Sequence, residues 1–447
     1  MTGTGERVGI VGGGILGMTL AHRLRAAGMQ PTILEAAPHS GGLASSQSIG
    51  GYTWDRFYHV ILLSDGHLRG LLDELGVSEQ LRWGTTRTGF YTDERLYSMS
   101  DVLEFLRFPP LSLVDKLRLA GTIMYASRLR DWKRLESIPV TEWLSNLSGR
   151  HTFERIWLPL LRSKLGDNYR LASAAFIWAI IARMYAARRS GLKKEMFGYV
   201  EGGYDVILRR FRDRLEADGV DILCGRNVTN VHDLGSEVAV QFESGERRLF
   251  DKLILTISAP RVAAVCPQLS ESERERLHRV VYQGIICGSL LLRKPLADFY
   301  VTNITEDWVP FTAVIEMTAL VDRAHFGGHS LVYLPRYVTQ QDPAWETSDD
   351  ALWEANFKAL ERMYPGFDRR DVVATQTARV REMLAVSTLG YSDSAAPPLT
   401  TSMPNVYVAN SAQIANGTLN VEETVTLAEQ QARALASHFR RGLAAPA

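Results

Sequence analysis

Short apolar runs alternate with longer segments of helical spacing along this chain. Residues 8–11 form an apolar run, an alanine-rich stretch with helical periodicity follows, and a second apolar run ends at Glu35. Near the other end, residues 405–410 predict a strand, and the segment from Val421 predicts a helix. Apolar runs at 251–256 and 311–317 predict further strands. The pattern therefore predicts an α/β fold whose first unit is strand–turn–helix–strand.

Glycines occupy the first turn of this unit with the spacing Gly12-x-Gly14-x-x-Gly17. Gly12 permits a tight turn, Gly14 lets a pyrophosphate approach the backbone, and Gly17 lets the helix pack close to the strand. The helix N-terminus then offers N–H donors to the phosphates. Glu35, at the end of the second strand, is placed to accept ribose hydroxyls. The sequence therefore predicts a dinucleotide site.

Further segments distinguish between dinucleotides. A second glycine turn lies at 40–45, the sequence Trp-Asp-Arg-Phe-Tyr-His follows at 54–59, and the C-terminal strand–turn–helix complements the N-terminal unit. This layout resembles the FAD-dependent amine oxidase superfamily, which includes protoporphyrinogen oxidases, phytoene desaturases and, more distantly, UDP-galactopyranose mutases. The resemblance covers nearly the whole chain. It implies FAD as the cofactor and an oxidoreductase activity.

The resemblance also implies which residues hold FAD. Many relatives carry Gly-Asp after the C-terminal strand, where this chain has Asn410-Ser411, so the contact there is uncharged. Asn420 and Glu423 have the spacing of a capping box, and in the family that helix N-terminus points at the pyrimidine end of the flavin. The implied FAD contacts are Gly12, Gly14, Ile15, Leu16, Glu35, Gly41, Gly42, Leu43, Ala44, Asp55, Tyr58, Val228, Asn410, Ser411, Asn420 and Val421.

The chain of 447 residues is too long for one core and predicts two interleaved domains. We expect a glutathione-reductase-type FAD-binding Rossmann domain formed by residues 1–75, 196–262 and 385–447. An α+β substrate domain is expected from residues 76–195 and 263–384, with residues 107–195 as a helical insertion.

Cysteine content and hydropathy indicate the cellular compartment of the protein. Only Cys224, Cys266 and Cys287 occur, with no CxxC and no metal-ligand spacing, which argues for a reducing compartment and against a metal site. The resemblance places covalent flavin–cysteine links near the C-terminus, where no cysteine stands, so non-covalent FAD is expected. The longest apolar run, 171–182, is too short to span a bilayer, and no secretory signal is evident. We therefore expect a cytoplasmic protein.

Charge is unevenly distributed although the net charge is zero. Residues 107–195 carry 17 Lys or Arg against 7 Asp or Glu, a balance of +10. Helical spacing at 111–132 and 174–188 marks this stretch as the most helical part, and in the family such an insertion lies over the flavin. This basic cap has three interpretations: a solvated charged face, a site for an anionic substrate, or docking on an anionic membrane. Nothing resembles a nucleic-acid-binding module.

Three ionisable residues are candidates for proton handling. Lys164 follows an aromatic and apolar stretch, and several relatives place a lysine near flavin N5. The alternative interpretation of Lys164 is an ordinary surface lysine of the cap. By family position His59 lies near the isoalloxazine, where a histidine can transfer protons, and its alternative role is that of a structural histidine. Glu316 is embedded in an apolar strand, so it is either a base or a salt-bridge partner.

Substrate contacts are predicted on the cap and on one strand. Arg162 and Arg183 are the cap arginines expected at an anionic group, and Tyr333 and Tyr337 flank Leu-Pro-Arg on a predicted strand. The alternative for the two tyrosines is core packing.

Two enzyme functions follow from these predictions. The first is hydride transfer from a small organic substrate, one that bears a sugar or a phosphate, to flavin N5. The second is a redox-neutral isomerase, epimerase or mutase that acts on a nucleotide sugar or glycoside. A flavin-binding scaffold is the non-enzymatic alternative. A single dinucleotide motif argues against a second domain for NADPH.

Overall fold

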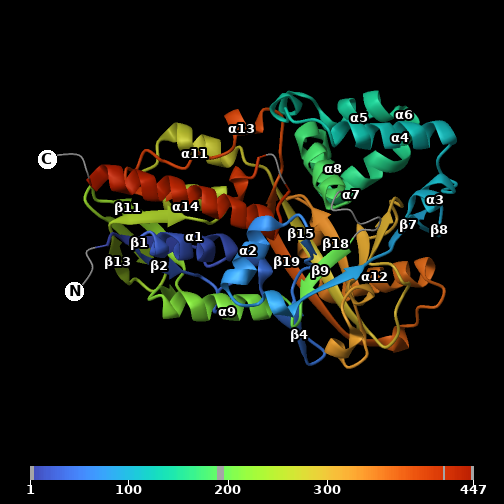
Figure 1. Ribbon diagram of the computed structural model, residues 1–447, viewed down its shortest axis with the longest axis horizontal. Helices are drawn as coiled ribbons and strands as arrows, with labels where there is room; N and C mark the ends of the chain where they lie inside the picture. Colours follow the sequence, from blue (N-terminus) through green and yellow to red (C-terminus); the bar gives the residue numbers. More distant parts are fainter. Residues whose placement is uncertain (1–4, 189–195, 416–417, 444–447) are drawn as a thin grey trace.

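The computed structural model describes residues 5–188, 196–415 and 418–443. Two large sheets form the two halves of the molecule, and a group of helices lies over one end of the second half (Figure 1). Residues 189–195 of the predicted basic cap and the chain ends 1–4 and 444–447 of the predicted FAD domain lie outside the described residues.

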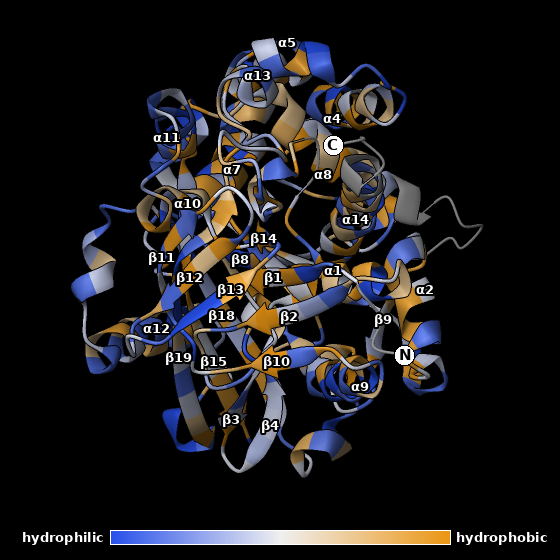
Figure 2. Ribbon diagram, turned by 90° about the vertical axis from the view of Figure 1, so that its left-hand side faces the viewer, coloured by the Kyte–Doolittle hydropathy of each residue, from blue (hydrophilic) through white to orange (hydrophobic). Residues whose placement is uncertain are grey.

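The first half is built on a five-stranded sheet in the order β10-β2-β1-β14-β20, with every pairing parallel. Its strands are distant in sequence, as their bounds show: β1 Arg7–Val11, β2 Gln30–Leu34, β10 Asp221–Leu223, β14 Lys252–Leu255 and β20 Val406–Val408. The central strands are largely apolar (Figure 2) because side chains alternate between two covered faces. Thus Ile10 and Ile33 enter one core, and Val11 and Leu34 enter the other.

Four helices cover one face of this sheet, and a small antiparallel sheet covers the other. The helices are α1 Ile15–Ala26, α2 Gly66–Glu74, α9 Tyr204–Ala217 and α14 Val421–Leu443. The small sheet contains β11 Val228–Asp233, β12 Val238–Phe242 and β13 Arg247–Phe250. Helices α10 Ala259–Val265 and α11 Glu271–His278 pack into the same core as this sheet. This arrangement is the predicted Rossmann-type unit.

The second half is built on a seven-stranded mixed sheet in the order β19-β15-β18-β17-β16-β7-β8. Its strands are β7 Thr88–Thr92, β8 Arg95–Ser98, β15 Tyr282–Leu292, β16 Val301–Ile304, β17 Ala313–Glu316, β18 Ser330–Val338 and β19 Val372–Ala385. One face packs on residues between Leu43 and Leu62, which we call the FAD-side loop, and the other packs on α12 Asp349–Met363. Smaller sheets pair β3 Ser46–Ile49 with β4 Tyr52–Asp55, and β9 Met196–Val200 with β5 Ile61–Leu62 and β6 Leu81–Thr85.

The helical group occupies the predicted cap, residues 107–195, and begins just before it with α3 Val102–Leu106. The helices within the cap are α4 Leu113–Ala126, α5 Val140–Ser148, α6 Arg150–Thr152, α7 Leu158–Leu165 and α8 Ala174–Arg188. A core of aromatic and aliphatic residues holds these helices together and extends to Leu384, near the end of β19, and to Val386, just after it. A short helix, α13 Tyr391–Ser394, follows. No helix within the described residues is long and apolar enough to cross a bilayer.

Candidate functional site

The turn between β1 and α1 depends on two of its glycines for its shape. Gly12 has a φ of +110°, and a Cβ there would lie 2.3 Å from Thr256 Oγ1. A Cβ on Gly17 would lie 2.0 Å from the carbonyl oxygen of Gly12. Larger residues at either position would push the helix away from the strand. The turn therefore has the geometry that the sequence predicts.

The second glycine turn lies directly beside the first. The Gly41 N–H donates to the Gly13 carbonyl at 2.8 Å, and Gly42 has a φ of +57°. A Cβ on Gly42 would approach the Gly14 Cα to 3.1 Å, whereas a Cβ on Gly14 would meet no atom closer than 3.8 Å. The Ser40 hydroxyl is buried nearby without a partner in the described part of the chain. Together these features form a side-chain-free cradle that suits a pyrophosphate.

Glu35 is held at the end of β2 beside this cradle. Its carboxylate accepts hydrogen bonds from the Gly13 N–H at 2.6 Å and the Ala37 N–H at 2.8 Å. Its own carbonyl accepts from the Arg226 N–H at 2.8 Å, two residues before Val228 begins β11. The predicted ribose-binding acid and the strand that begins at Val228, another implied FAD contact, therefore meet at one edge of the sheet.

The C-terminal strand and helix complete this side. The Asn410 amide donates to the Ile257 carbonyl at 2.8 Å, and its side-chain oxygen accepts from the Ala412 N–H at 3.1 Å. Ser411 is only half-buried. Asn420 caps α14, because its side-chain oxygen accepts from the Glu423 N–H at 3.0 Å. The asparagine half of the expected capping box is therefore present.

Asp55 connects the two halves of the molecule. Its carboxylate is buried and accepts from the Tyr204 N–H at 2.7 Å, at the first residue of α9. Its carbonyl accepts from the Tyr333 hydroxyl at 2.5 Å. These contacts fasten helix α9 and strand β18 to the last residue of β4. Sequence reasoning missed Tyr204, for which the only signal was its position after two glycines.

Three predicted residues from distant segments meet in a hydrogen-bonded chain. Lys164 Nζ, on α7, donates to Tyr337 Oη, on β18, at 2.5 Å. Tyr337 Oη in turn lies 2.8 Å from Tyr58 Oη, in the loop after β4, and either hydroxyl can donate. We call these residues the Lys164–Tyr337–Tyr58 chain. It lies where the cap, the seven-stranded sheet and the FAD-side loop converge, and Leu43 of the second glycine turn packs on the same cluster.

Burial determines the protonation of the two phenols. It raises the pKa of Tyr337 to about 12 and the pKa of Tyr58 well above its ordinary value. Both hydroxyls therefore remain protonated near neutral pH. A protonated phenol both donates and accepts, so the chain can pass a hydrogen bond from the Lys164 ammonium towards Tyr58.

His59 lies beside Tyr204 and Asp55. The His59 and Tyr204 ring centroids are 4.7 Å apart, and His59 Nδ1 is 3.8 Å from Asp55 Oδ2. His59 Nδ1 and the Tyr204 hydroxyl are buried without hydrogen-bond partners in the described residues. Buried donors and acceptors of this kind are rare in proteins and are expected where a ligand binds.

The two cap arginines do not join the Lys164–Tyr337–Tyr58 chain. Arg183 Nη2 lies 3.1 Å from both carboxylate oxygens of the buried Asp65, so its charge is paired. Arg162 is exposed on α7 and lies over the Tyr169 ring. Arg183 Nη1 is buried without a partner in the described residues, and contact of either arginine with substrate stays a prediction. Asp65, which sequence reasoning missed, has no local signal because its partner is 118 residues away.

Glu316 requires a correction. It pairs in register with Val332, whereas the neighbouring Ile315 pairs with Tyr333. Adjacent strand residues point to opposite faces, so Glu316 lies on the α12 side of the sheet, away from Tyr333 and Tyr337. Its carboxylate accepts from the Leu296 N–H at 3.2 Å and the Ala297 N–H at 3.0 Å. Burial raises its pKa to about 7, but it does not face the candidate site.

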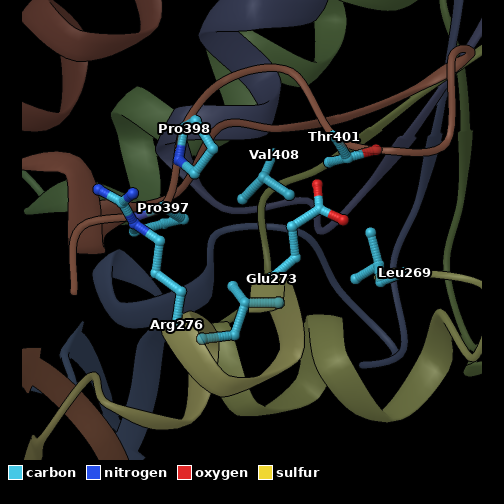
Figure 3. Close-up of a pocket in the computed structure, with 8 residues that line it drawn as sticks. Leu269, Glu273, Arg276, Pro397, Pro398, Thr401 and Val408 are labelled. Carbon is cyan, nitrogen blue, oxygen red and sulfur yellow. The ribbon is translucent and has the colours of Figure 1, made fainter. Parts of the chain in front are cut away.

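A separate hollow lies between α11 and the segment before β20 (Figure 3). Its polar residues are already bonded within the protein. Glu273 accepts from the Ser402 N–H at 2.6 Å, and Arg276 donates to the Ala396 carbonyl at 2.8 Å. This hollow is a structural junction of the first half.

Comparison with known proteins agrees with this geometry. Residues 17–436 match the family of flavin containing amine oxidoreductases, and the chain belongs to this family. FAD is accordingly the cofactor of the chain.

The individual relatives share less than a third of their aligned residues with this chain. A coproporphyrinogen III oxidase from Mycobacterium leprae is 27% identical over 300 residues, an alignment that covers 61% of this chain and 64% of that protein. A proposed protoporphyrinogen oxidase from Exiguobacterium sp. 255-15 superposes with a TM-score of 0.77 at 19% identity, covering 97% of this chain and 99% of that one. A reduced UDP-galactopyranose mutase superposes with a TM-score of 0.73 at 16% identity, covering 96% and 94%. These two structures share the fold.

Proposed function

We propose that this protein removes hydride from a carbon atom of an anionic organic substrate that lies against the Lys164–Tyr337–Tyr58 chain. The observation that carries the proposal is the convergence of Lys164, Tyr337 and Tyr58 from the cap, the sheet and the FAD-side loop. An ammonium group linked to two buried phenols, beside a flavin site, suits proton management during substrate oxidation.

The cofactor contacts proposed here follow the glycine cradle. Gly14 and Gly42, where no side chain intrudes, would hold the pyrophosphate. Glu35 would hold the ribose, and the N-terminus of α14 at Val421, whose dipole favours negative charge, would face the far end of the cofactor. When bound, FAD supplies the hydride acceptor. The expected absence of a covalent link stays a prediction.

The residues around the chain have separate roles. Lys164 supplies positive charge and a proton donor at its Nζ atom, and Tyr337 holds that ammonium in place. Tyr58 extends the hydrogen bonds towards the FAD-side loop. His59 has an unpartnered Nδ1 and is proposed to hold a proton near the flavin ring. Tyr333 has a bonded hydroxyl and positions Asp55.

Two anionic substrate classes are consistent with this site. The basic cap favours a substrate that bears a phosphate or a sugar phosphate, as the sequence predicts. The mycobacterial relative favours a coproporphyrinogen, whose name marks it as that relative's substrate. Pairing of Arg183, Arg150 and Arg155 with acids reduces the free charge of the cap, which weakens the first class. We therefore place the porphyrinogen class first, in a reducing compartment such as the cytoplasm.

The redox-neutral reaction remains the second candidate. A mutase shares the fold, and its structure was determined in the reduced state. A charged lysine–tyrosine pair near the flavin also suits binding of a nucleotide-sugar phosphate.

Anaerobic absorbance titration of the FAD-loaded protein tests these proposals. Coproporphyrinogen III, protoporphyrinogen IX, nucleotide sugars and amines are added in turn while the oxidised flavin band is followed. Bleaching by one class identifies the hydride donor, and reoxidation by air identifies an oxidase. Conversion of a nucleotide sugar only after chemical reduction of the flavin would instead establish the redox-neutral reaction. If no class of compound bleaches the flavin and none is converted after its reduction, the proposal is refuted.

A further inference from the structure

Helices α3 and α4 expose an unusual amount of apolar surface. The residues concerned are 48–74% exposed and lie within 24 positions of one another: Val102, Leu103, Leu106, Leu113, Val114, Leu117, Met124 and Tyr125. We call this set the α3–α4 face. Helices α3 and α4 contact each other, and a concentration of exposed apolar side chains on neighbouring helices marks an interaction site.

The outward side of α4 is more apolar than that of an ordinary surface helix. Its buried side contributes Leu119 and Ala126 to the cap core, and its two buried charged residues are bonded within the cap. Asp115 accepts from Ser112 and Thr152, and Lys116 donates to the Leu106 carbonyl. Leu113 and Leu117, one helical turn apart, are each 65% exposed. The helix therefore carries apolar side chains on its outward side that no described part of the chain covers.

Positive charge accompanies this face. Arg107, at the end of α3, and Arg130, beyond α4, are exposed, and their side chains have no hydrogen bond or ion pair with any described residue. Two acids at α3 accept hydrogen bonds within the protein. Glu104 accepts from Ser98 at 2.6 Å and from the Ser100 N–H at 2.7 Å, and Asp101 accepts from the Glu104 N–H at 2.9 Å. The surface offers unpaired cations beside aliphatic side chains, which complements an anionic, partly apolar surface.

We propose that the α3–α4 face docks on the surface of an anionic lipid bilayer, with the two helices in the plane of the headgroups. These helices lie at the end of the molecule opposite the two termini (Figure 1), so docking leaves the FAD half free. This inference does not depend on which substrate is oxidised.

Vesicle sedimentation tests the proposal with the full-length, FAD-loaded protein. Vesicles of phosphatidylcholine with about one third phosphatidylserine should carry the protein down, and pure phosphatidylcholine should carry far less. Substituting L113S, L117S and M124S together should lower the bound fraction at least about tenfold. Substituting R107Q and R130Q should lower partitioning about fivefold per arginine and reduce its salt dependence.

Matched variants separate docking from general surface changes. L234S with L249S removes exposed apolar residues, and R210Q with R247Q removes exposed arginines, all in the FAD half. These control variants should bind vesicles as the wild type does, and flavin absorbance should confirm folding in every case. Absence of vesicle binding, or equal losses in the control variants, would overturn the proposal. A concentration-dependent dimer that the triple serine variant abolishes, without vesicle binding, would assign the face to a second copy of the chain.

Discussion

Lys164 and Tyr337 contact each other in two ways at once. Nζ donates a hydrogen bond to the phenol oxygen at 2.5 Å and lies 4.0 Å from the centroid of the same ring. A hydrogen bond and a cation–π contact together restrict the ammonium more than either does alone. The pair is therefore a preorganised cationic group.

The cradle predicts different outcomes for two glycine variants. Gly14→Ala should fold normally, because its Cβ meets nothing closer than 3.8 Å, but it should bind FAD at least about tenfold more weakly since the methyl group enters the pyrophosphate space. Gly17→Ala should instead destabilise the fold, because its Cβ would clash with the Gly12 carbonyl. Flavin titration and thermal unfolding distinguish the two effects. Gly70→Ala, with open space around it, is the matched control, and an unchanged FAD affinity for Gly14→Ala would contradict the cradle.

The two phenols should contribute unequally to flavin reduction. Tyr337→Phe removes the acceptor for Lys164 as well as the partner of Tyr58, whereas Tyr58→Phe leaves the lysine contact intact. We expect a loss of about a hundredfold for the first variant and a smaller loss for the second. Stopped-flow absorbance measures both rates.

The raised pKa values of Tyr58 and Tyr337 also predict how the rate of flavin reduction depends on pH. Below about pH 10 neither phenol should ionise, so neither should produce a limb in the pH–rate profile. Tyr364→Phe, buried in the core on the α12 side of the sheet, serves as control. Equal effects of the Tyr58 and Tyr337 variants would argue against the order of the chain.

Arg183 and Asp65 should act as a structural lock between the cap and the FAD half. Arg183→Met leaves the Asp65 carboxylate buried without its cation, which should lower the free energy of unfolding by about 3 kcal/mol. The double variant with Asp65→Asn should recover part of this loss, because the uncompensated charge is gone. Denaturant unfolding of the four proteins gives the coupling energy, and strictly additive losses would show that the pair is not coupled.

Glu316 predicts a specific pH dependence of stability. Its pKa is raised from 4.5 to about 7 by burial, so between these values the folded state binds more protons than the unfolded state. Stability should therefore fall as pH rises through this window, by about 3 kcal/mol for this group. Glu316→Gln should flatten the profile without changing FAD affinity, and the exposed Glu354→Gln should leave it unchanged. An unaltered slope in Glu316→Gln would show that the carboxyl is not protonated in the fold.

Local motifs were readable from the sequence because their geometry is local. The roles of Gly12 and Gly17 follow from chain turns within a few residues, and Glu35 follows from the strand that must end beside them. The parallel sheet was predictable for the same reason, because buried strands between helices read as apolar runs.

The catalytic candidates could not be arranged from sequence alone. Lys164 and Tyr337 are 173 positions apart, and Tyr58 and Tyr337 are 279 apart, so only the tertiary fold brings them together. Glu316 was misplaced because an apolar strand identifies burial but not which face a given residue occupies. The pairing of Ile315 with Tyr333 settles that face.

Anaerobic flavin reduction in Lys164→Met is the most direct test of the proposed site. With the substrate identified by titration, the account predicts that the variant binds FAD like the wild type but reduces it about a hundredfold more slowly. Lys358→Met, an exposed lysine on α12, should react like the wild type. A Lys164→Met protein that reduces its flavin at the wild-type rate would contradict the account.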